Sequence, residues 1–197
     1  MGEIVEYGSA AGGYQAAADM GGAVDFLQGH PAVRGSGLGV VGFCMGGGLA
    51  LWLATLRPDA ILAAVCFYGL APRGKQPDWS KLAAAVEGYY AEHDDLAGFG
   101  AARQLEAELT EAGKEVRVFL YPGTAHAFFN DTRPEVYDPD AARQAWVRTL
   151  EFLRASWDKF FSGNVANLPG RPCRVVFVKH FTNSLPEELP WLIVPPL

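Results

Sequence analysis

The sequence predicts an α/β fold in which a mostly parallel sheet carries helices on both faces. Two observations lead to this prediction. Short apolar runs typical of strands alternate along the chain with longer segments of helical spacing, and this order builds parallel sheets from strand–helix–strand units. One strand also passes directly into a helix through the glycine-rich turn Gly42-Phe43-Cys44-Met45-Gly46. The 197 residues are long enough for one domain with a real hydrophobic core.

The first half of the chain supplies two strands and two helices of this pattern. Residues 14–28 are rich in Ala, Met, Phe and Leu and are expected to form the first helix. The apolar run 38–43 is the first strand, and the helix at 45–56 follows it until Pro58 stops that helix. The next apolar run, 63–68, is the second strand.

The second half repeats the order. A strand at 86–91 precedes a helix at 97–112, for which Gly113 is the expected C-cap. A further strand at 116–121 precedes a helix at 138–156. This last helix has the clearest amphipathic pattern, with apolar residues at three- and four-residue spacing on one buried face: Ala142, Trp146, Leu150 and Leu153.

The turn between strand 38–43 and its helix has the pattern of a nucleophile elbow, with Cys44 where serine is usual. Glycines two residues before and two residues after the nucleophile remove Cβ atoms that would clash as the strand doubles back into the helix. Cys44 then lies at a helix N-terminus, where the partial positive charge favours the thiolate. The backbone N–H of Met45 is expected to supply one oxyanion donor.

An elbow nucleophile requires an acid and then a histidine later in the chain. Asp94 follows strand 86–91, and His126 follows strand 116–121. Both therefore fall, like Cys44, at the carboxyl ends of parallel strands, where chemistry gathers in open α/β sheets. We expect Cys44 to be the nucleophile, His126 the general base and Asp94 the group that orients the imidazole.

Each of these residues also fits a structural role when it is taken singly, and the case for catalysis depends on their order and common placement. Asp95 is an alternative acid because it is adjacent to Asp94. Glu92 and His93 are expected to be solvated loop residues, and Cys66 is expected to lie in the core of its strand.

Further motifs follow the elbow in order: Phe67-Tyr68-Gly69, Tyr90-Ala91-Glu92-His93-Asp94 and Tyr121-Pro122-Gly123-Thr124-Ala125-His126-Ala127-Phe128. With Gly42-Phe43-Cys44-Met45-Gly46-Gly47 they resemble the dienelactone hydrolase family of the α/β-hydrolase superfamily, from about residue 15 to residue 157. The resemblance implies hydrolysis of small esters or lactones by a Cys44–His126–Asp94 triad, and it favours Asp94 over Asp95. It implies neither a cofactor nor a metal.

The chain also departs from the family. Residues 1–157 correspond to the C-terminal two thirds of the family's domain, so the chain is expected to be N-terminally truncated relative to the family. The section that precedes them in the family supplies the second oxyanion N–H. Asn130 stands where the best-known members carry an arginine that binds the substrate carboxylate. The alternative function is therefore a catalytically impaired paralogue that acts, if at all, through protein association.

Residues 158–197 do not resemble the family and are expected to be a C-terminal extension. Residues 173–178 are its strand-like run. Without the family's preceding strands, strand 38–43 becomes an apolar sheet edge with unpaired backbone groups, which invites pairing. We expect residues 173–178 to dock onto this edge or the face beside it. The competing expectation is a homodimer through the exposed edge.

Composition limits the partners. The formal net charge of −6 and the lack of a basic patch argue against nucleic acid. The chain has three cysteines without a C-x-x-C pair and four histidines without metal-ligand spacing. These features fit a reduced, cytoplasmic setting. No apolar run approaches the length of a membrane span, and no signal peptide is visible.

Overall fold

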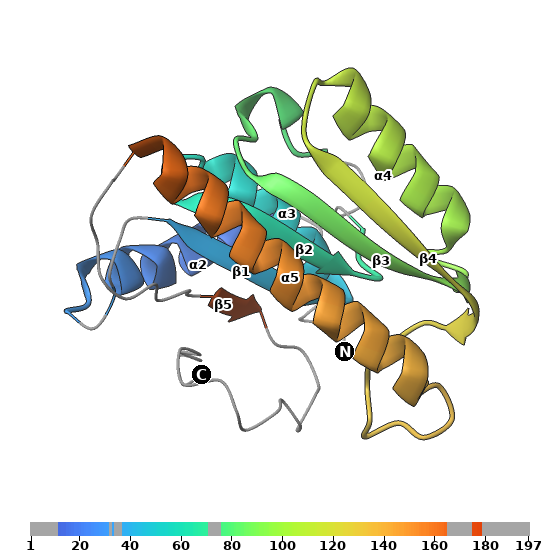
Figure 1. Ribbon diagram of the computed structural model, residues 1–197. Coiled ribbons are helices and arrows are strands. Elements are labelled where there is room, and N and C mark those ends of the chain that lie inside the picture. Colours follow the sequence, from blue (N-terminus) through green and yellow to red (C-terminus); the bar gives the residue numbers. More distant parts are fainter. Residues whose placement is uncertain (1–11, 32, 34–36, 71–75, 165–174, 179–197) are drawn as a thin grey trace.

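The computed structural model describes residues 12–31, 33, 37–70, 76–164 and 175–178 (Figure 1). Its sheet has five strands in the order β4-β3-β2-β1-β5, and every neighbouring pair is parallel. The strands are β1 (Leu38–Phe43), β2 (Ile61–Phe67), β3 (Ala85–His93), β4 (Val116–Ala125) and β5 (Val175–Val178). The predicted parallel α/β sheet is confirmed.

Helices cover both faces of the sheet, as predicted. They are α2 (Gly12–Gly29), α3 (Met45–Leu56), α4 (Phe99–Glu111) and α5 (Pro139–Asn164), with the short 3₁₀ helix η1 (Trp79–Lys81) before β3. Figure 1 shows α5 crossing the front of the sheet, with α3 behind it. α2, α3 and α4 share one core cluster, and α5 contributes to a second cluster on the opposite face.

Strand β1 shows why both faces are apolar. Leu38 and Val40 belong to the core on the α3 side, whereas Val41 and Phe43 belong to the core on the α5 side. Side chains of a strand alternate between the two faces, so a strand covered on both sides is a continuous apolar run. This is the pattern that identified the strands in the sequence.

Three elements extend further than the sequence pattern predicts. β3 continues to His93, and β4 continues through Pro122 to Ala125, because the ladder resumes at His93 opposite Ala125 after a register shift. Glu92 and His93 are thus exposed, as expected, but they belong to a strand and not to a loop. α5 continues without interruption past residue 157 to Asn164.

The strand β5 lies against the strand that leads to Cys44. β5 pairs in parallel with β1, with Gly39 opposite Val175 and Gly42 opposite Val178. β1 therefore has a neighbour on each side, as the docking expectation required. Cys173, which was expected to begin this strand, lies outside the described residues, and a homodimer through a sheet edge stays a prediction.

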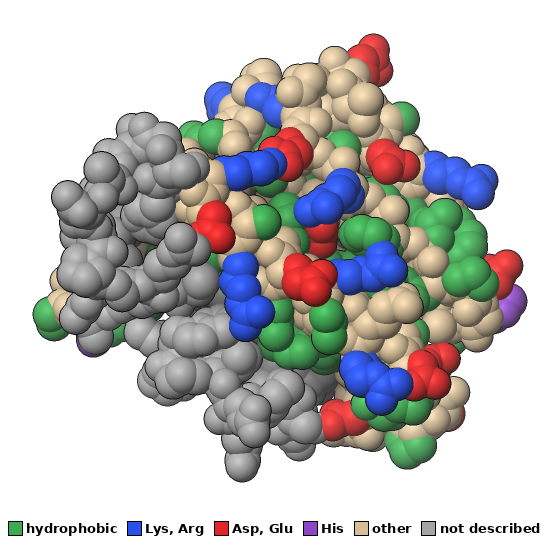
Figure 2. Space-filling view, in the orientation of Figure 1, with side chains coloured by type: hydrophobic (Ala, Val, Ile, Leu, Met, Phe, Trp, Pro, Cys, Tyr) green, Lys and Arg blue, Asp and Glu red, His purple; other side chains and the backbone are tan. Residues whose placement is uncertain are grey.

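The α5 face carries charges of both signs, and Figure 2 shows basic and acidic side chains interspersed across it. One carboxylate lies beneath this surface. Glu87, on β3, is only 2% exposed; it accepts a hydrogen bond from the Tyr89 hydroxyl at 2.5 Å and pairs with Arg117 at 2.8 Å. Burial raises the pKa of Glu87 in spite of these partners.

In the described part of the chain, no helix is both long enough and apolar enough to cross a membrane.

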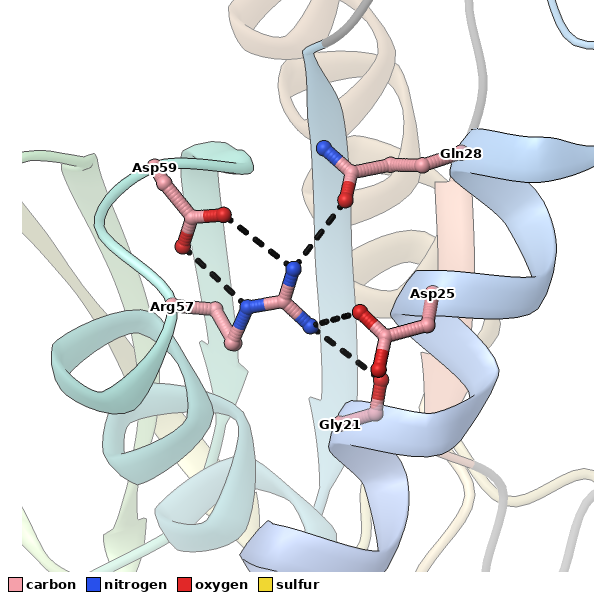
Figure 3. A network of polar contacts seen from close by, with 5 residues as sticks. All are labelled: Gly21, Asp25, Gln28, Arg57 and Asp59. Carbon is pink, nitrogen blue, oxygen red and sulfur yellow. Dashed lines mark hydrogen bonds and ion pairs between the residues drawn. The ribbon is translucent and has the colours of Figure 1, made fainter.

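Arg57 fastens α2 to the rest of the molecule (Figure 3). Its guanidinium donates to Asp25 at 2.6 Å, to the Gly21 carbonyl at 3.2 Å and to the Gln28 side chain at 3.0 Å, all on α2. It also donates twice to Asp59 in the turn before β2, at 3.1 Å each. A planar five-donor fork suits such a set of acceptors better than an ammonium group does.

We expect Arg57→Ala and Arg57→Lys to lower the free energy of unfolding by roughly 1–2 kcal/mol, because both lose the fork that joins α2 to the α3–β2 turn. Urea unfolding followed by circular dichroism measures the loss. Arg103→Ala on the exposed side of α4 is the control and should change stability by less than about 0.5 kcal/mol. Equal losses in all three variants would contradict the assignment.

A double substitution in β5, Val176→Pro with Phe177→Pro, should release the strand, because proline cannot donate to the ladder. Amide hydrogen exchange should then accelerate in β1, and size-exclusion chromatography should detect association through the opened edge. The matched variant, Val176→Ala with Phe177→Ala, keeps both N–H donors and should retain more protection. Unchanged exchange in the proline variant would show that β1 does not depend on β5.

Candidate active site

Cys44 lies at the junction of β1 and α3 in a strained backbone conformation. Its φ is 55° and its ψ is −125°, a region that L residues rarely adopt. Two hydrogen bonds hold the turn: the Cys44 N–H donates to the Phe67 carbonyl on β2, and the Gly47 N–H donates to the Cys44 carbonyl, both at 2.9 Å. The side chain is half-buried at the N-terminus of α3.

Close approach of the backbone explains two of the glycines. A Cβ on Gly42 would lie 2.0 Å from the Gly46 carbonyl oxygen, so the strand and the helix can meet only if this residue is glycine. A Cβ on Gly69 would lie 2.6 Å from the carbonyl oxygen of Cys44. The Phe67-Tyr68-Gly69 motif therefore packs directly against the elbow.

The three side chains predicted from the sequence lie in contact. His126 Nε2 is 3.2 Å from Cys44 Sγ, and His126 Nδ1 is 2.6 Å from Asp94 Oδ2. The second Asp94 oxygen accepts the backbone N–H groups of Leu96 at 2.9 Å and Ala97 at 2.8 Å. The aspartate is thereby fixed on both sides, and the imidazole bridges it to the thiol.

The charges of this set depend on one another. The hydrogen bond with His126 lowers the pKa of Cys44 and outweighs the burial that opposes it. The Asp94 hydrogen bond, with a smaller contribution from Cys44, raises the pKa of His126 to about 9. Burial alone would raise the pKa of Asp94, but the hydrogen bonds from His126, Ala97 and Leu96 lower it. These shifts favour a thiolate beside an imidazolium.

A model of the dienelactone hydrolase family matches residues 5–157 of the sequence. The chain belongs to the dienelactone hydrolase family. It is 35% identical over 131 residues to Protein usf of Aquifex pyrophilus, a match that covers 66% of this chain and 56% of that protein. It is 39% identical over 114 residues to a candidate carboxymethylenebutenolidase of Saccharolobus solfataricus, covering 58% of this chain and 42% of that one.

Solved structures agree with this family. A crystal structure of a candidate dienelactone hydrolase from Klebsiella pneumoniae superposes with a TM-score of 0.61 at 27% identity, covering 71% of this chain and 60% of that one. The chain spans about half the length of the relatives that it matches, from 42% to 56% for the first three.

The other candidate residues of this dienelactone hydrolase family member lie apart from the contacts that join Cys44, His126 and Asp94. Asp95 is exposed, whereas Asp94 makes the hydrogen bond with Nδ1 of the His126 imidazole. Glu92 accepts the backbone N–H of Gly123 at 2.8 Å and so ties the ends of β3 and β4 together. Asn130 is buried, and its side-chain oxygen accepts two hydrogen bonds from Thr132, at 2.7 Å from the hydroxyl and at 3.1 Å from the N–H. This oxygen therefore closes a turn.

Met45 is the first residue of α3, so its N–H has no acceptor four residues earlier in the helix. A backbone hydrogen bond from Met45 contributes to the lowered pKa of Cys44. Within the described ranges, no group of three His, Cys, Asp or Glu residues is arranged to hold a metal ion.

Tyr68 is a site residue to which the sequence alone gave no role. It follows β2 with φ 39°, and its buried ring lies edge-on to His126 with 5.2 Å between the ring centroids. Phe128 packs against the same tyrosine at 5.4 Å. The only signal in the sequence was its place in the Phe67-Tyr68-Gly69 motif, which predicts no contact partner.

The lowered pKa of Cys44 predicts alkylation at unusually low pH. Iodoacetamide labelling of Cys44 should reach half its limiting rate below pH 8.5, the approximate pKa of a free thiol, because the thiolate forms as pH rises through the lowered value. His126→Ala removes the main stabilising partner and should move this midpoint upward. Peptide mass spectrometry assigns the label.

The fully buried Cys66 supplies an internal control for this labelling. Desolvation raises the pKa of its thiol to about 11, so it should react far more slowly than Cys44 in the folded protein. Earlier labelling of Cys66 or Cys173, or an unchanged midpoint in His126→Ala, would contradict the assignment of Cys44 as the activated thiol.

Proposed function

We propose that this protein hydrolyses small esters or lactones with Cys44 as nucleophile, His126 as general base and Asp94 as the residue that orients His126. One observation carries the proposal: the imidazole lies between the cysteine sulfur and a buried aspartate, at 3.2 and 2.6 Å. This is the hydrogen-bonded order that nucleophilic acyl transfer requires. Membership of the dienelactone hydrolase family supports it.

The reaction follows from these contacts. The Cys44 thiolate attacks the ester carbonyl carbon, and the resulting oxyanion accepts a hydrogen bond from the Met45 N–H. The intermediate collapses to a thioester, and the leaving alkoxide takes the proton from His126 Nε2. Water then attacks the thioester while His126 accepts its proton. The second collapse releases the carboxylic acid product and returns Cys44 and His126 to their starting state.

Exposed apolar side chains follow three neighbouring strands of the sheet and suggest a substrate with apolar groups beside its carbonyl. Met45 is 37% exposed, Leu70 is 39% exposed and Leu96 is 63% exposed. They follow β1, β2 and β3, within two residues of Cys44, Gly69 and Asp94 respectively. Among relatives, a protein of Bradyrhizobium that is 32% identical over 145 residues is named as a candidate lactonase.

Triad substitutions test the proposal with p-nitrophenyl acetate as substrate. Cys44→Ala and His126→Ala should each remove nearly all hydrolysis above background, and Asp94→Asn should lower kcat on the order of 10²–10⁴-fold by favouring the wrong imidazole tautomer. Asp95→Asn is the matched control and should retain activity. Activity that survives in Asp94→Asn but is lost in Asp95→Asn would transfer the orienting role.

If the wild-type chain is inactive but still shows selective Cys44 alkylation, activation of the thiol and turnover of esters are separate properties. Its thiol would be activated, yet the chain would lack part of the machinery needed to turn over esters. Loss of one oxyanion donor alone lowers turnover on the order of 10²–10³-fold. This outcome would overturn the hydrolase proposal and leave the geometry of the triad intact.

A further inference from the structure

A buried hydrogen-bond cluster lies behind the elbow, on the side of the sheet that faces α3. The Tyr90 hydroxyl on β3 donates to the Gly69 carbonyl at 3.0 Å. Cys66 Sγ on β2 lies 3.5 Å from both that hydroxyl and that carbonyl oxygen. Tyr90 and Cys66 are completely buried. The mechanism proposed for the triad uses neither side chain.

Gly69 joins this cluster to the elbow, because its backbone packs against the backbone of Cys44 and of the first turn of α3. A Cβ on Gly69 would lie 2.6 Å from the Cys44 carbonyl oxygen, 2.7 Å from the Gly48 nitrogen and 2.8 Å from the Gly47 Cα. The Gly69 backbone therefore rests directly on the turn that holds Cys44 and on the first turn of α3. A shift of Gly69 by a few tenths of an ångström must move the elbow or open a gap beside it.

The same segment reaches His126 through Tyr68. The N–H of Tyr68 donates to the Tyr89 carbonyl at 2.7 Å, and the residue adopts φ 39° immediately before Gly69. Its ring lies edge-on to the imidazole, 5.2 Å between centroids. The Tyr68–Gly69 segment is thus held by two groups on β3, the Tyr89 carbonyl and the Tyr90 hydroxyl. Its Gly69 backbone packs against Cys44, and its Tyr68 ring packs against His126.

We propose that Tyr90 is a positioning residue for the active site: its hydroxyl fixes Gly69, and through Gly69 and Tyr68 it sets the Cys44–His126 contact. The effect on turnover rests on the proposed hydrolase function, whereas the effect on the thiol does not. The role belongs to the hydroxyl and not to the ring, because the ring's packing in the core survives replacement by phenylalanine.

Among the residues that the structure describes, no other strong donor reaches the Gly69 carbonyl. Desolvation raises the pKa of Tyr90 well above its ordinary value, so the hydroxyl remains a donor throughout the working pH range. Without it, the donor that remains for this carbonyl in the described part of the chain is the Cys66 S–H at 3.5 Å, which is a weak donor. A buried carbonyl without its main donor costs free energy, and a move toward another donor lowers this cost.

The test compares two neighbouring tyrosines that point to opposite faces of β3. Tyr90→Phe removes the hydroxyl behind the elbow. Tyr89→Phe removes an equally buried hydroxyl that donates to Glu87, and it leaves the Tyr89 backbone carbonyl in place. Both variants are measured for urea stability, for the rate and pH profile of Cys44 alkylation by iodoacetamide, and for kcat and KM with p-nitrophenyl acetate.

For Tyr90→Phe we expect Cys44 alkylation to slow at neutral pH and its midpoint to move upward, since the thiolate loses part of its contact with His126. We expect kcat to fall roughly tenfold, less than the 10²-fold that a displacement of about 1 Å can cause, while KM changes less than about twofold. Tyr89→Phe should lower the urea midpoint but leave the alkylation profile and kcat at wild-type values.

Cys66→Ala is the second variant. It removes the sulfur and some packing but keeps the Tyr90–Gly69 hydrogen bond, so its alkylation profile should stay close to that of the wild type. The proposal is overturned if Tyr90→Phe retains the wild-type profile, or if Tyr89→Phe or Cys66→Ala shifts it equally. If the wild type does not hydrolyse the ester, the hydrolase proposal fails, but the alkylation comparison still decides the role of Tyr90.

Discussion

Every part of this site depends on how closely the backbone segments around Cys44 can approach one another. The cysteine adopts φ 55° and ψ −125°, a conformation that costs of order 1–3 kcal/mol and persists only where the surroundings enforce it. They do so through a hydrogen bond from its N–H to the Phe67 carbonyl and through the contact of Gly42 with Gly46. The direction in which α3 leaves the sheet, and the place where Gly69 can rest, follow from this contact.

The electrostatic arrangement is an extension of that backbone geometry. Cys44, Asp94 and His126 follow β1, β3 and β4, which lie in one parallel sheet with β2 between β1 and β3, so the carboxyl ends of these strands present the three side chains at one edge of the sheet. Asp94 can remain charged although it is 9% exposed, because two N–H groups and the imidazole solvate it in place of water. Its charge then supports a protonated His126 beside the thiolate.

The sheet combines four strands that lie within the region matched by the family model and one strand, β5, that lies beyond it. The family match ends at residue 157, yet the strand beside β1 is β5, at residues 175–178. A segment beyond the matched region therefore completes the backbone pairing of the strand that leads to Cys44. This arrangement satisfies polar groups of β1 that would otherwise form an open edge.

The sequence by itself determined the fold class, the elbow and the order of the three site residues, because local rules govern these features: apolar runs mark buried strands, glycines flank a tight turn, and strand ends gather at one edge. Only the tertiary structure decided which of the adjacent Asp94 and Asp95 contacts His126, and that the Asn130 side-chain oxygen closes a turn with Thr132. It alone placed the Tyr90 hydroxyl behind Gly69. Each of these contacts joins groups whose separation is set by strand register and packing, which the local pattern of residues does not encode.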